Sequence, residues 1–250
     1  MIIGFPLRCI IIIIESGVME KMTEQKDFYL LQVNDALFPI GGYSHSQGLE
    51  TYIQKGIVHD EVSAAQYIRQ KLCWNLTYTE LLAARLAWEY ADQEDIQRLN
   101  ELEEILEASR LPMEQREASR KMGSRFAKTM GALQLPENGS FRKYTAARKG
   151  KTMSHCCVYG VFCAALSIEK RQALSHFLYA QISATVTNCV KTIPLSQSSG
   201  QKLLSECYPL MAEELERVEH LTVEDLCLSA PGFDLRGMQH ERLYSRIYMS

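Results

Sequence analysis

Apolar residues recur every three or four positions over most of this chain, which is the spacing of amphipathic helices. The longest pattern starts after Asp60, a residue type that caps helix N-termini, and reaches Tyr90 with one irregularity near residues 77–79. No alternation with a period of two, bounded by hairpin turns, is found. The chain is therefore predicted to be all-α, with helical patterns over residues 60–90, 94–109, 112–133, 158–166, 171–190 and 200–219, and a first helix or extended packing segment over 28–38.

Two stretches depart from this pattern. Residues 135–150 carry a proline, two glycines and scattered bases, and are predicted to form a long loop. Residues 229–250 are loosely patterned but rich in aromatic and arginine side chains, which is typical of a tail that folds on a partner. We therefore expect a single-domain bundle of about seven to ten helices over residues 25–228, followed by a flexible partner-binding tail at 229–250.

The N-terminus is predicted to be an extension to this bundle. MIIGFPLRCIIIII is apolar, but Arg8 interrupts it and it is too short for a membrane span of about 20 residues. No small-residue cleavage site follows it, as a signal peptide would require. We expect residues 1–24 to be a disordered arm or a mis-started extension, with translation properly beginning at Met19 or Met22. No other run approaches membrane length, so a soluble protein is expected.

Composition narrows the class of protein further. With 250 residues, 46% hydrophobic and 23% charged, the chain has an ordinary globular balance and enough length for one large domain. Its eight cysteines form no CxxC pair and no regular framework, which favours free thiols in a reducing cytoplasm. The formal net charge of −3 argues against a dedicated nucleic-acid binder.

Charge is nevertheless distributed in blocks. Residues 92–107 hold seven acids and one base, whereas residues 120–151 hold nine bases and one acid. One interpretation is that the two faces are solvated and partly neutralise each other. The other is a positive patch that meets an acidic partner surface.

The sequence FPIGGYSHSQGLE, residues 38–50, is the stretch least like the rest of the chain. Its GYSHS resembles the G-x-S-x-G nucleophile elbow, but the last position is Ser46 and that elbow needs an α/β sheet. A catalytic triad must also converge in space, which adjacent residues such as Ser44 and His45 rarely do. The segment is better explained as a glycine-shaped surface, and a hydrolase using Ser44 and His45 remains the alternative.

Two further motifs suggest ligand chemistry weakly. ARKGKT, residues 147–152, ends like a phosphate-binding loop, but the first glycine of that pattern is replaced by Thr145. His155, Cys156 and Cys157 offer soft metal ligands, although neighbouring side chains on a helix diverge by about 100°. Buried cysteines that face neighbouring helices explain this cluster better, and no metal site is predicted.

Three segments, taken together, resemble the UreF family of urease accessory proteins. LLQVNDALFPIGGYSHSQGLE (30–50) is similar to the family's N-terminal signature, and CVKTIPLSQSSGQKLL (189–204) to its Pro-Leu-x-Gln-x-x-Gly-Gln segment. MQHERLYSRIYMS (238–250) resembles its C-terminal His-Glu-x-Leu-Tyr-Ser-Arg ending. The segments occur in the family's order, so the resemblance covers about residues 25–250, and it is close to Helicobacter-type members. The extra first 20-odd residues and the double cysteine depart from the family's pattern.

This resemblance implies an all-α, homodimeric, cytoplasmic assembly factor for nickel urease that is not itself an enzyme. The family joins the accessory protein UreD, called UreH in Helicobacter, to the GTPase UreG and to apo-urease. No firmly bound cofactor is expected, because the complex handles the nickel. No nucleic acid or membrane partner is implied. A direct nickel carrier that uses His155, Cys156 and Cys157 is a further alternative.

Carried onto this chain, the three motifs mark candidate partner-binding residues. These are Pro39, Gly41, Gly42, Tyr43, His45, Gly48, Glu50, Pro194, Gln197, Gly200, Gln201, His240, Glu241, Leu243, Tyr244 and Arg246. We expect Pro194 to Gln201 to form a turn between two helices. The small residues of helix 171–190 favour close helix approach, so Tyr179, Ala180, Ser183 and Thr187 are the candidate dimer interface.

Overall fold

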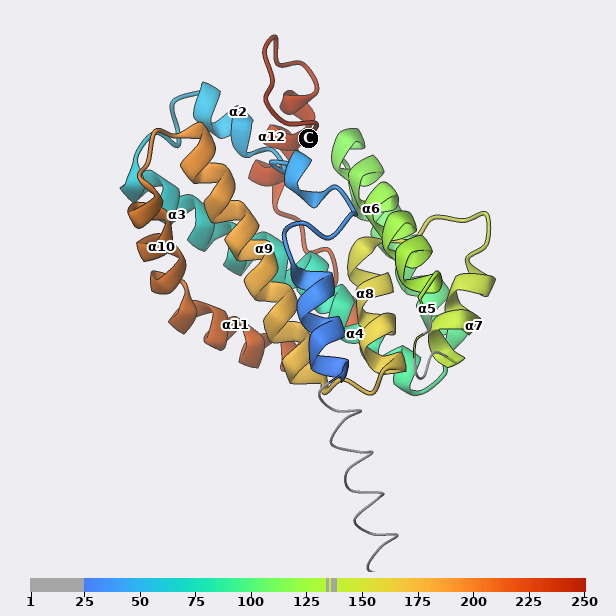
Figure 1. Cartoon of the computed structure of the whole chain (residues 1–250). Helices are drawn as coiled ribbons and strands as arrows, with labels where there is room; N and C mark the ends of the chain where they lie inside the picture. The colour runs from blue at the N-terminus through green and yellow to red at the C-terminus, as the bar shows by residue number, and fades with distance from the viewer. Residues whose placement is uncertain (1–24, 134, 136–138) are drawn as a thin grey trace, which may run out of the picture.

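The computed structural model describes residues 25–133, 135 and 139–250, so the predicted extension at 1–24 lies outside the described residues. The described residues form helices and turns with no strand, which confirms the all-α prediction (Figure 1). None of the described helices is long and apolar enough to cross a membrane.

Residues 25–34 are helical, and the named elements follow them. In chain order these are η1 (Gly42–Ser44), α2 (Leu49–Gln54), α3 (Glu61–Lys71), η2 (Leu72–Leu81), α4 (Leu82–Asp92), α5 (Ile96–Ser109), α6 (Met113–Gly131), α7 (Gly139–Ala147), α8 (His155–Ala165), α9 (Lys170–Thr192), α10 (Gln197–Glu206), α11 (Tyr208–His220), η3 (Val223–Asp225) and α12 (Pro231–His240). Helices α4 and α8 pack together at the centre, with α9, α10 and α11 on one side and α5, α6 and α7 on the other (Figure 1).

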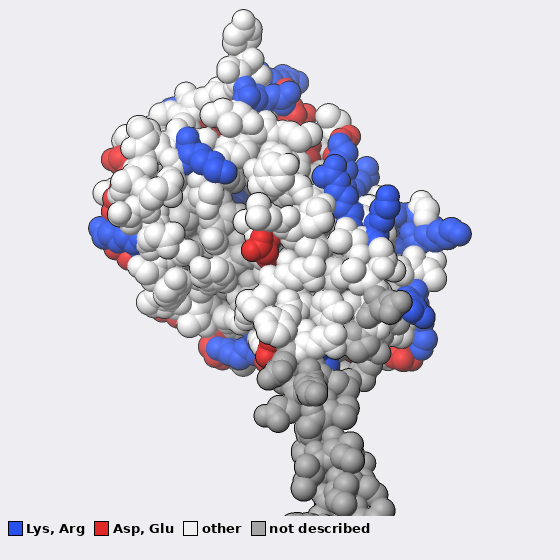
Figure 2. All heavy atoms as spheres, viewed as in Figure 1, with Lys and Arg blue, Asp and Glu red and all other residues white. Residues whose placement is uncertain are grey.

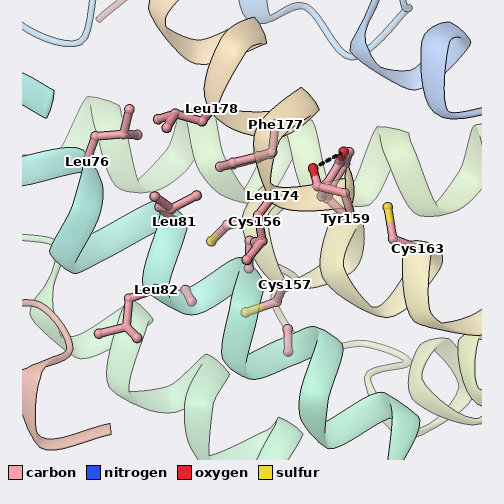
Figure 3. Packing of buried hydrophobic residues seen from close by; sticks show 14 of the residues in the cluster. Leu76, Leu81, Leu82, Cys156, Cys157, Tyr159, Cys163, Leu174, Phe177 and Leu178 are labelled. Carbon is pink, nitrogen blue, oxygen red and sulfur yellow. Dashed lines mark hydrogen bonds between the residues drawn. The ribbon is translucent and has the colours of Figure 1, made fainter. Parts of the chain in front are cut away.

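The central pair of helices approaches closely because small residues line its interface. A Cβ atom at Gly160 of α8 would lie 2.3 Å from the main-chain oxygen of Ala84 in α4. Leu81, Leu82 and Leu174 are buried in the same hydrophobic core (Figure 3). Burial of such aliphatic side chains stabilises a fold by about 1.5–3 kcal/mol each. The core therefore depends on the backbone distance that Gly160 permits.

The irregularity expected near residues 77–79 is a widening of the helix. Helices α3 and α4 are joined without a break by η2, a π-helical stretch. The hydroxyl of Thr77 donates to the Leu72 carbonyl at 2.8 Å, and the hydroxyl of Thr79 donates to Asn75 at 2.7 Å. Threonine side chains thus satisfy carbonyls that the wider turn leaves free.

Two details of the predicted helix pattern were wrong. Residues 135–150 are not one long loop, because α7 occupies 139–147 and buries Phe141 and Tyr144. Residues 200–219 are not one helix, because α10 and α11 meet at Cys207. Pro209, in the first turn of α11, has no N–H to continue the preceding helix.

The acidic and basic blocks partly neutralise each other, as one of the two interpretations held. Lys143 pairs with Glu94 at 2.6 Å, Arg148 with Glu104 at 2.8 Å, and Arg120 with Glu107. Basic side chains nevertheless gather over α6 and α7 at the right of the molecule (Figure 2). Lys128 of α6 and Lys149, which follows α7, are exposed.

Lys71, at the end of α3, is a buried charge that we expect to lower stability. Its side chain is 3% exposed, lies 5.9 Å from the Phe233 ring and forms no ion pair with a described carboxylate. Burial lowers the pKa of Lys71 to about 8. The unfolded chain therefore binds this proton more tightly, so stability rises as the pH increases from about 8 to 10.5.

Lys71→Met is accordingly expected to raise the free energy of unfolding by about 1–3 kcal/mol at pH 7. The gain over the native chain should shrink as the pH rises from 8 to 10. Urea unfolding followed by circular dichroism at several pH values measures both effects. Lys128→Met, at an exposed position of α6, is the matched control and should change stability little. A variant less stable than the native chain at pH 7 would contradict the prediction.

Candidate functional site

The candidate site brings together two segments from opposite ends of the chain. We call residues 38–50 the glycine-rich segment and residues 244–250 the strap. The strap lies between α2 and α6, beside the glycine-rich segment (Figure 1). The expectation that residues 229–250 are a flexible tail outside the core was wrong, because 231–240 form α12 and Tyr248 is 6% exposed.

Main-chain hydrogen bonds hold the strap against the glycine-rich segment. The Met249 N–H donates to the Ser44 carbonyl at 2.8 Å. The Ser250 main-chain oxygen accepts from the N–H groups of Ser46 and Gln47 at 2.5 and 2.9 Å, and from the Ser46 hydroxyl at 2.9 Å. The Gln54 side chain donates to the Ser245 carbonyl at 2.7 Å. These bonds satisfy the backbone of both segments and fix their relative position.

Glu50, in the first turn of α2, fastens the centre of the strap. One carboxylate oxygen accepts from the Ile247 N–H at 2.7 Å, and the other from the Tyr248 N–H at 3.1 Å. The second oxygen also lies 3.2 Å from Nε2 of His240. Glu50 is 4% exposed, so these bonds form away from water, where hydrogen bonds to a charged acceptor contribute most.

Helix α12 carries the chain to the strap and is itself anchored at its middle and at its C-terminal end. The Thr51 hydroxyl donates to the Arg236 carbonyl at 3.0 Å. Glu241 accepts from the Met113 N–H at 2.9 Å, so it caps the N-terminus of α6. His240 is fully buried and lies 2.7 Å from the carboxylate of Glu114. Arg246 of the strap binds the other oxygen of Glu114.

Two glycines permit the shape of this site. Gly41 has φ 84° and Gly48 has φ 86°, in the left-handed region that side chains disfavour. A Cβ atom at Gly48 would lie 3.2 Å from the backbone of Gly237 in α12. A Cβ atom at Gly41 would lie 2.5 Å from the guanidinium of Arg125, which donates to the Ile40 carbonyl. Both positions therefore need glycine for conformation, and at Gly48 the backbone of Gly237 also leaves little space for a side chain.

Ser44 and His45 are not arranged as a nucleophile and its base. The Ser44 hydroxyl donates to the Gly41 carbonyl at 2.7 Å. The His45 ring instead lies 2.8 Å from the Ser250 hydroxyl. Burial lowers the pKa of His45, and the charges of Lys121 and Arg125 lower it further, so the ring is neutral near pH 7. Its role in this geometry is to hold the strap.

The His155, Cys156 and Cys157 cluster belongs to the core. Both thiols lie among the packed side chains between α4 and α8 (Figure 3). Burial raises the pKa of Cys157, and the neighbouring Cys156 thiol raises it further. Burial lowers the pKa of His155 to about 4. Within the described residues no group of three or more histidine, cysteine or acidic side chains could hold a metal ion.

The second predicted motif lies at the junction of α9 and α10. The prediction of a turn up to Gln201 was wrong, because α10 begins at Gln197. Ser196 caps this helix, its hydroxyl accepting from the Ser199 N–H at 3.0 Å. Pro194, Gln197 and Gln201 are exposed, whereas Gly200 is buried where a Cβ atom would lie 2.6 Å from Val190.

The remaining residues predicted to bind partners differ in their exposure to solvent. Pro39, Tyr43, Tyr244 and Arg246 are exposed; Gly42, His45, Glu241 and Leu243 are half-buried; Gly41, Gly48, Glu50 and His240 are buried. The buried residues thus shape the surface on which the exposed ones stand. The predicted dimer residues Tyr179, Ala180, Ser183 and Thr187 line a groove of about 390 Å³ between α9 and residues 33–43.

Sequence reasoning missed three residues of this site. Ser46 binds the strap, Asn188 of α9 donates to the His45 carbonyl at 3.0 Å, and Glu114 binds His240 and Arg246. Glu114 lies in the first turn of α6, where an acidic residue is ordinarily explained by the helix dipole. No local signal distinguishes it from other acids at helix N-termini.

Over the residues that the structure describes, the fold and the site define an all-helical protein in which the strap and the glycine-rich segment form one surface. A model of the UreF family matches residues 58–208. The chain is 36% identical over 223 residues to a protein of Bacillus sp. (strain TB-90) named urease accessory protein UreF, covering 88% of this chain and 97% of the relative. A protein of the same name from Lachnoclostridium phytofermentans is 34% identical over 222 residues, with coverage of 88% and 97%. The chain belongs to the UreF family, as its motifs predicted.

Proposed function

We propose that this chain is a urease maturation protein that links a UreG-type GTPase to a UreD/UreH-type accessory protein and to apo-urease for nickel insertion. Family membership and relatives named urease accessory protein support this role. The observation that carries the proposal is the joining of two family motifs, 204 positions apart in sequence, by the bonds between Ser46 and Ser250. A rigid composite surface of this kind suits a scaffold.

The proposed docking face consists of the exposed side chains around this joint. Tyr43 is 70% exposed and Tyr244 is fully exposed, although aromatic side chains are ordinarily buried in a monomer. Tyrosine is enriched where interfaces concentrate their binding energy. We propose that this face meets the UreD/UreH-type partner, and that the exposed end of α9 and start of α10 contributes to the UreG-type contact.

The chain is proposed to act without catalysis and without a firmly bound cofactor, as a cytoplasmic homodimer. The separate partners of Ser44 and His45 support the first point, since a nucleophile must hydrogen-bond its base. Nickel is proposed to be handled by the complex. The groove beside Tyr179 supports a dimer contact on α9.

Size-exclusion chromatography of this chain with its UreD/UreH-type and UreG-type partners, with and without GTP and Ni²⁺, tests the scaffold role. We expect one co-eluting complex, and urease activation in cells that lack their own UreF. Ser44→Ala should leave that activation nearly intact, because the hydroxyl donates to the Gly41 carbonyl of its own turn. Loss of activation in a folded Ser44→Ala protein would favour a hydrolase, and stoichiometric Ni²⁺ in equilibrium dialysis of the isolated chain would favour a carrier.

A further inference from the structure

Three basic side chains form an exposed row along α6. Lys121, Arg125 and Lys128 are spaced by four and three positions, so they share one face of the helix, and all three are exposed. Figure 2 shows Lys and Arg side chains gathered over α6 and α7, with few acidic side chains among them. We call these three residues the basic stripe.

The rest of the chain neutralises this stripe only in part. Lys121 pairs with Glu117 at 3.3 Å, and the Arg125 guanidinium donates to the Ile40 carbonyl at 3.1 Å. Within the described part of the chain, no carboxylate forms an ion pair with Arg125 or Lys128. Two of the three positive charges are therefore left facing solvent.

The spacing of the stripe opposes folding of α6. Like charges that are three or four positions apart on a helix repel each other and destabilise it. Lys121 and Arg125 form one such pair, and Arg125 and Lys128 form another. No acid offsets them locally, since residues 118–135 contain none. A stripe that repels itself in the isolated chain is neutralised when it meets a negatively charged surface.

The stripe adjoins the surface that the strap and the glycine-rich segment form. Arg125 binds that segment through the Ile40 carbonyl. Lys121 lines an open groove of about 470 Å³ together with Ile247 and Met249 of the strap. The two glutamates of α6 in this groove are already paired with basic side chains. A molecule that covers the strap therefore reaches the stripe without crossing an unpaired acid of this groove.

The side chains around the stripe favour a protein partner over a nucleic acid or a membrane. Phe126, Phe141 and Tyr144 are buried, so none of these rings can stack on a base. Met122 is half-buried and packs on the core, so the stripe offers no large exposed apolar side chain to enter a lipid surface. What α6 presents is a row of separate positive charges, which carboxylates on a protein surface complement.

We propose that the basic stripe receives an acidic surface of the protein that docks on the strap and the glycine-rich segment, and that this charge pairing guides the docking. The inference rests on the proposed function, because a UreD/UreH-type protein is the partner assigned to that face. Exposed charges act chiefly on the rate of association, and salt weakens their effect by screening them.

Association rates of the full-length chain with the UreD/UreH-type protein, measured by surface plasmon resonance, test this inference. At about 50 mM salt, Lys121→Glu combined with Lys128→Glu is expected to slow association at least about tenfold. At about 500 mM salt, the double variant and the native chain should differ by less than about threefold, because screening removes the steering. Arg125 is left unchanged because it also holds the Ile40 carbonyl.

Equal association rates at low salt, in a double variant with native circular dichroism, would overturn the inference and leave the scaffold role in place. Lys121→Gln combined with Lys128→Gln removes the two charges without adding acids to α6. This milder variant keeps the test decisive if the glutamate variant does not fold. Its association at low salt should be slower than that of the native chain by at least about threefold.

Arg69→Glu combined with Arg171→Glu is the matched control. It changes the net charge by the same amount as the glutamate variant of the stripe, at exposed positions of α3 and α9. Its association rate at low salt should stay within about threefold of the native rate. Equal slowing in the two double variants would show that net charge controls the rate, and would overturn a role for the stripe.

Two binding assays on the isolated chain exclude other anionic partners. Cosedimentation with phosphatidylserine vesicles and a gel shift with single-stranded DNA are expected to show no binding at about 150 mM salt. Binding of either that is lost in the glutamate variant would assign the stripe to a membrane or a nucleic acid instead. A native chain that forms no complex with the UreD/UreH-type protein at any salt concentration would overturn the proposed function, and this inference with it.

Discussion

Gly160→Val is expected to lower the free energy of unfolding by at least about 3 kcal/mol, and to prevent accumulation of folded protein if native stability is ordinary. The new Cβ atom would lie 2.3 Å from the Ala84 carbonyl oxygen and 3.0 Å from the Trp88 nitrogen. Both are main-chain atoms of α4, so no rotamer change relieves the clash. Helices α4 and α8 would have to separate, which opens the packed centre of the molecule.

Urea unfolding followed by circular dichroism, together with soluble yield, measures this loss. Gly131→Ala is the matched control, since Gly131 also lies in a helix but has no atom within 4 Å of its Cβ position. The free energy of unfolding of Gly131→Ala should rise by no more than about 1 kcal/mol, because alanine is a better helix former than glycine. A Gly160→Val protein as stable as the control would mean that α4 and α8 are not in close contact.

Glu50→Ala is expected to free the strap and to reduce co-purification of a UreD/UreH-type partner by at least about tenfold. The substitution leaves the Ile247 and Tyr248 N–H groups without their acceptor and the His240 ring without one of its two carboxylates. Each hydrogen bond to a charged group contributes about 1.5–3 kcal/mol, so losing two shifts strap closure by more than a hundredfold. Urease activation should fall in parallel.

Partner pull-down and trypsin cleavage after Arg246, measured on the same protein, separate loss of docking from loss of closure. Glu61→Ala is the control, because Glu61 is a carboxylate in the first turn of α3 whose partner is Lys202, at 3.0 Å. It should leave both readouts unchanged. Full partner binding by Glu50→Ala with a freely cleaved strap would place the docking face elsewhere.

Most helices could be predicted because their signals are local. Asp60 does cap α3, with its side chain accepting from the Ser63 N–H, and the heavily apolar α8 is buried as expected. Helix α7 was missed because prolines, glycines and bases obscured the spacing of Phe141 and Tyr144. Arg148 directly follows that helix and is 1% exposed. Its guanidinium donates to the Thr152 carbonyl at 2.9 Å.

The sequence by itself determined the all-α class, the family and the three motif segments. Helix periodicity and the order of residues within a motif are both properties of neighbouring residues. Only the tertiary structure decided that His45 meets Ser250, that Glu50 holds the strap, and that His240 lies buried between two carboxylates. These contacts join residues up to 205 positions apart. Hydrogen bonding and burial act over a few ångströms in space, and chain order does not specify which distant side chains come that close.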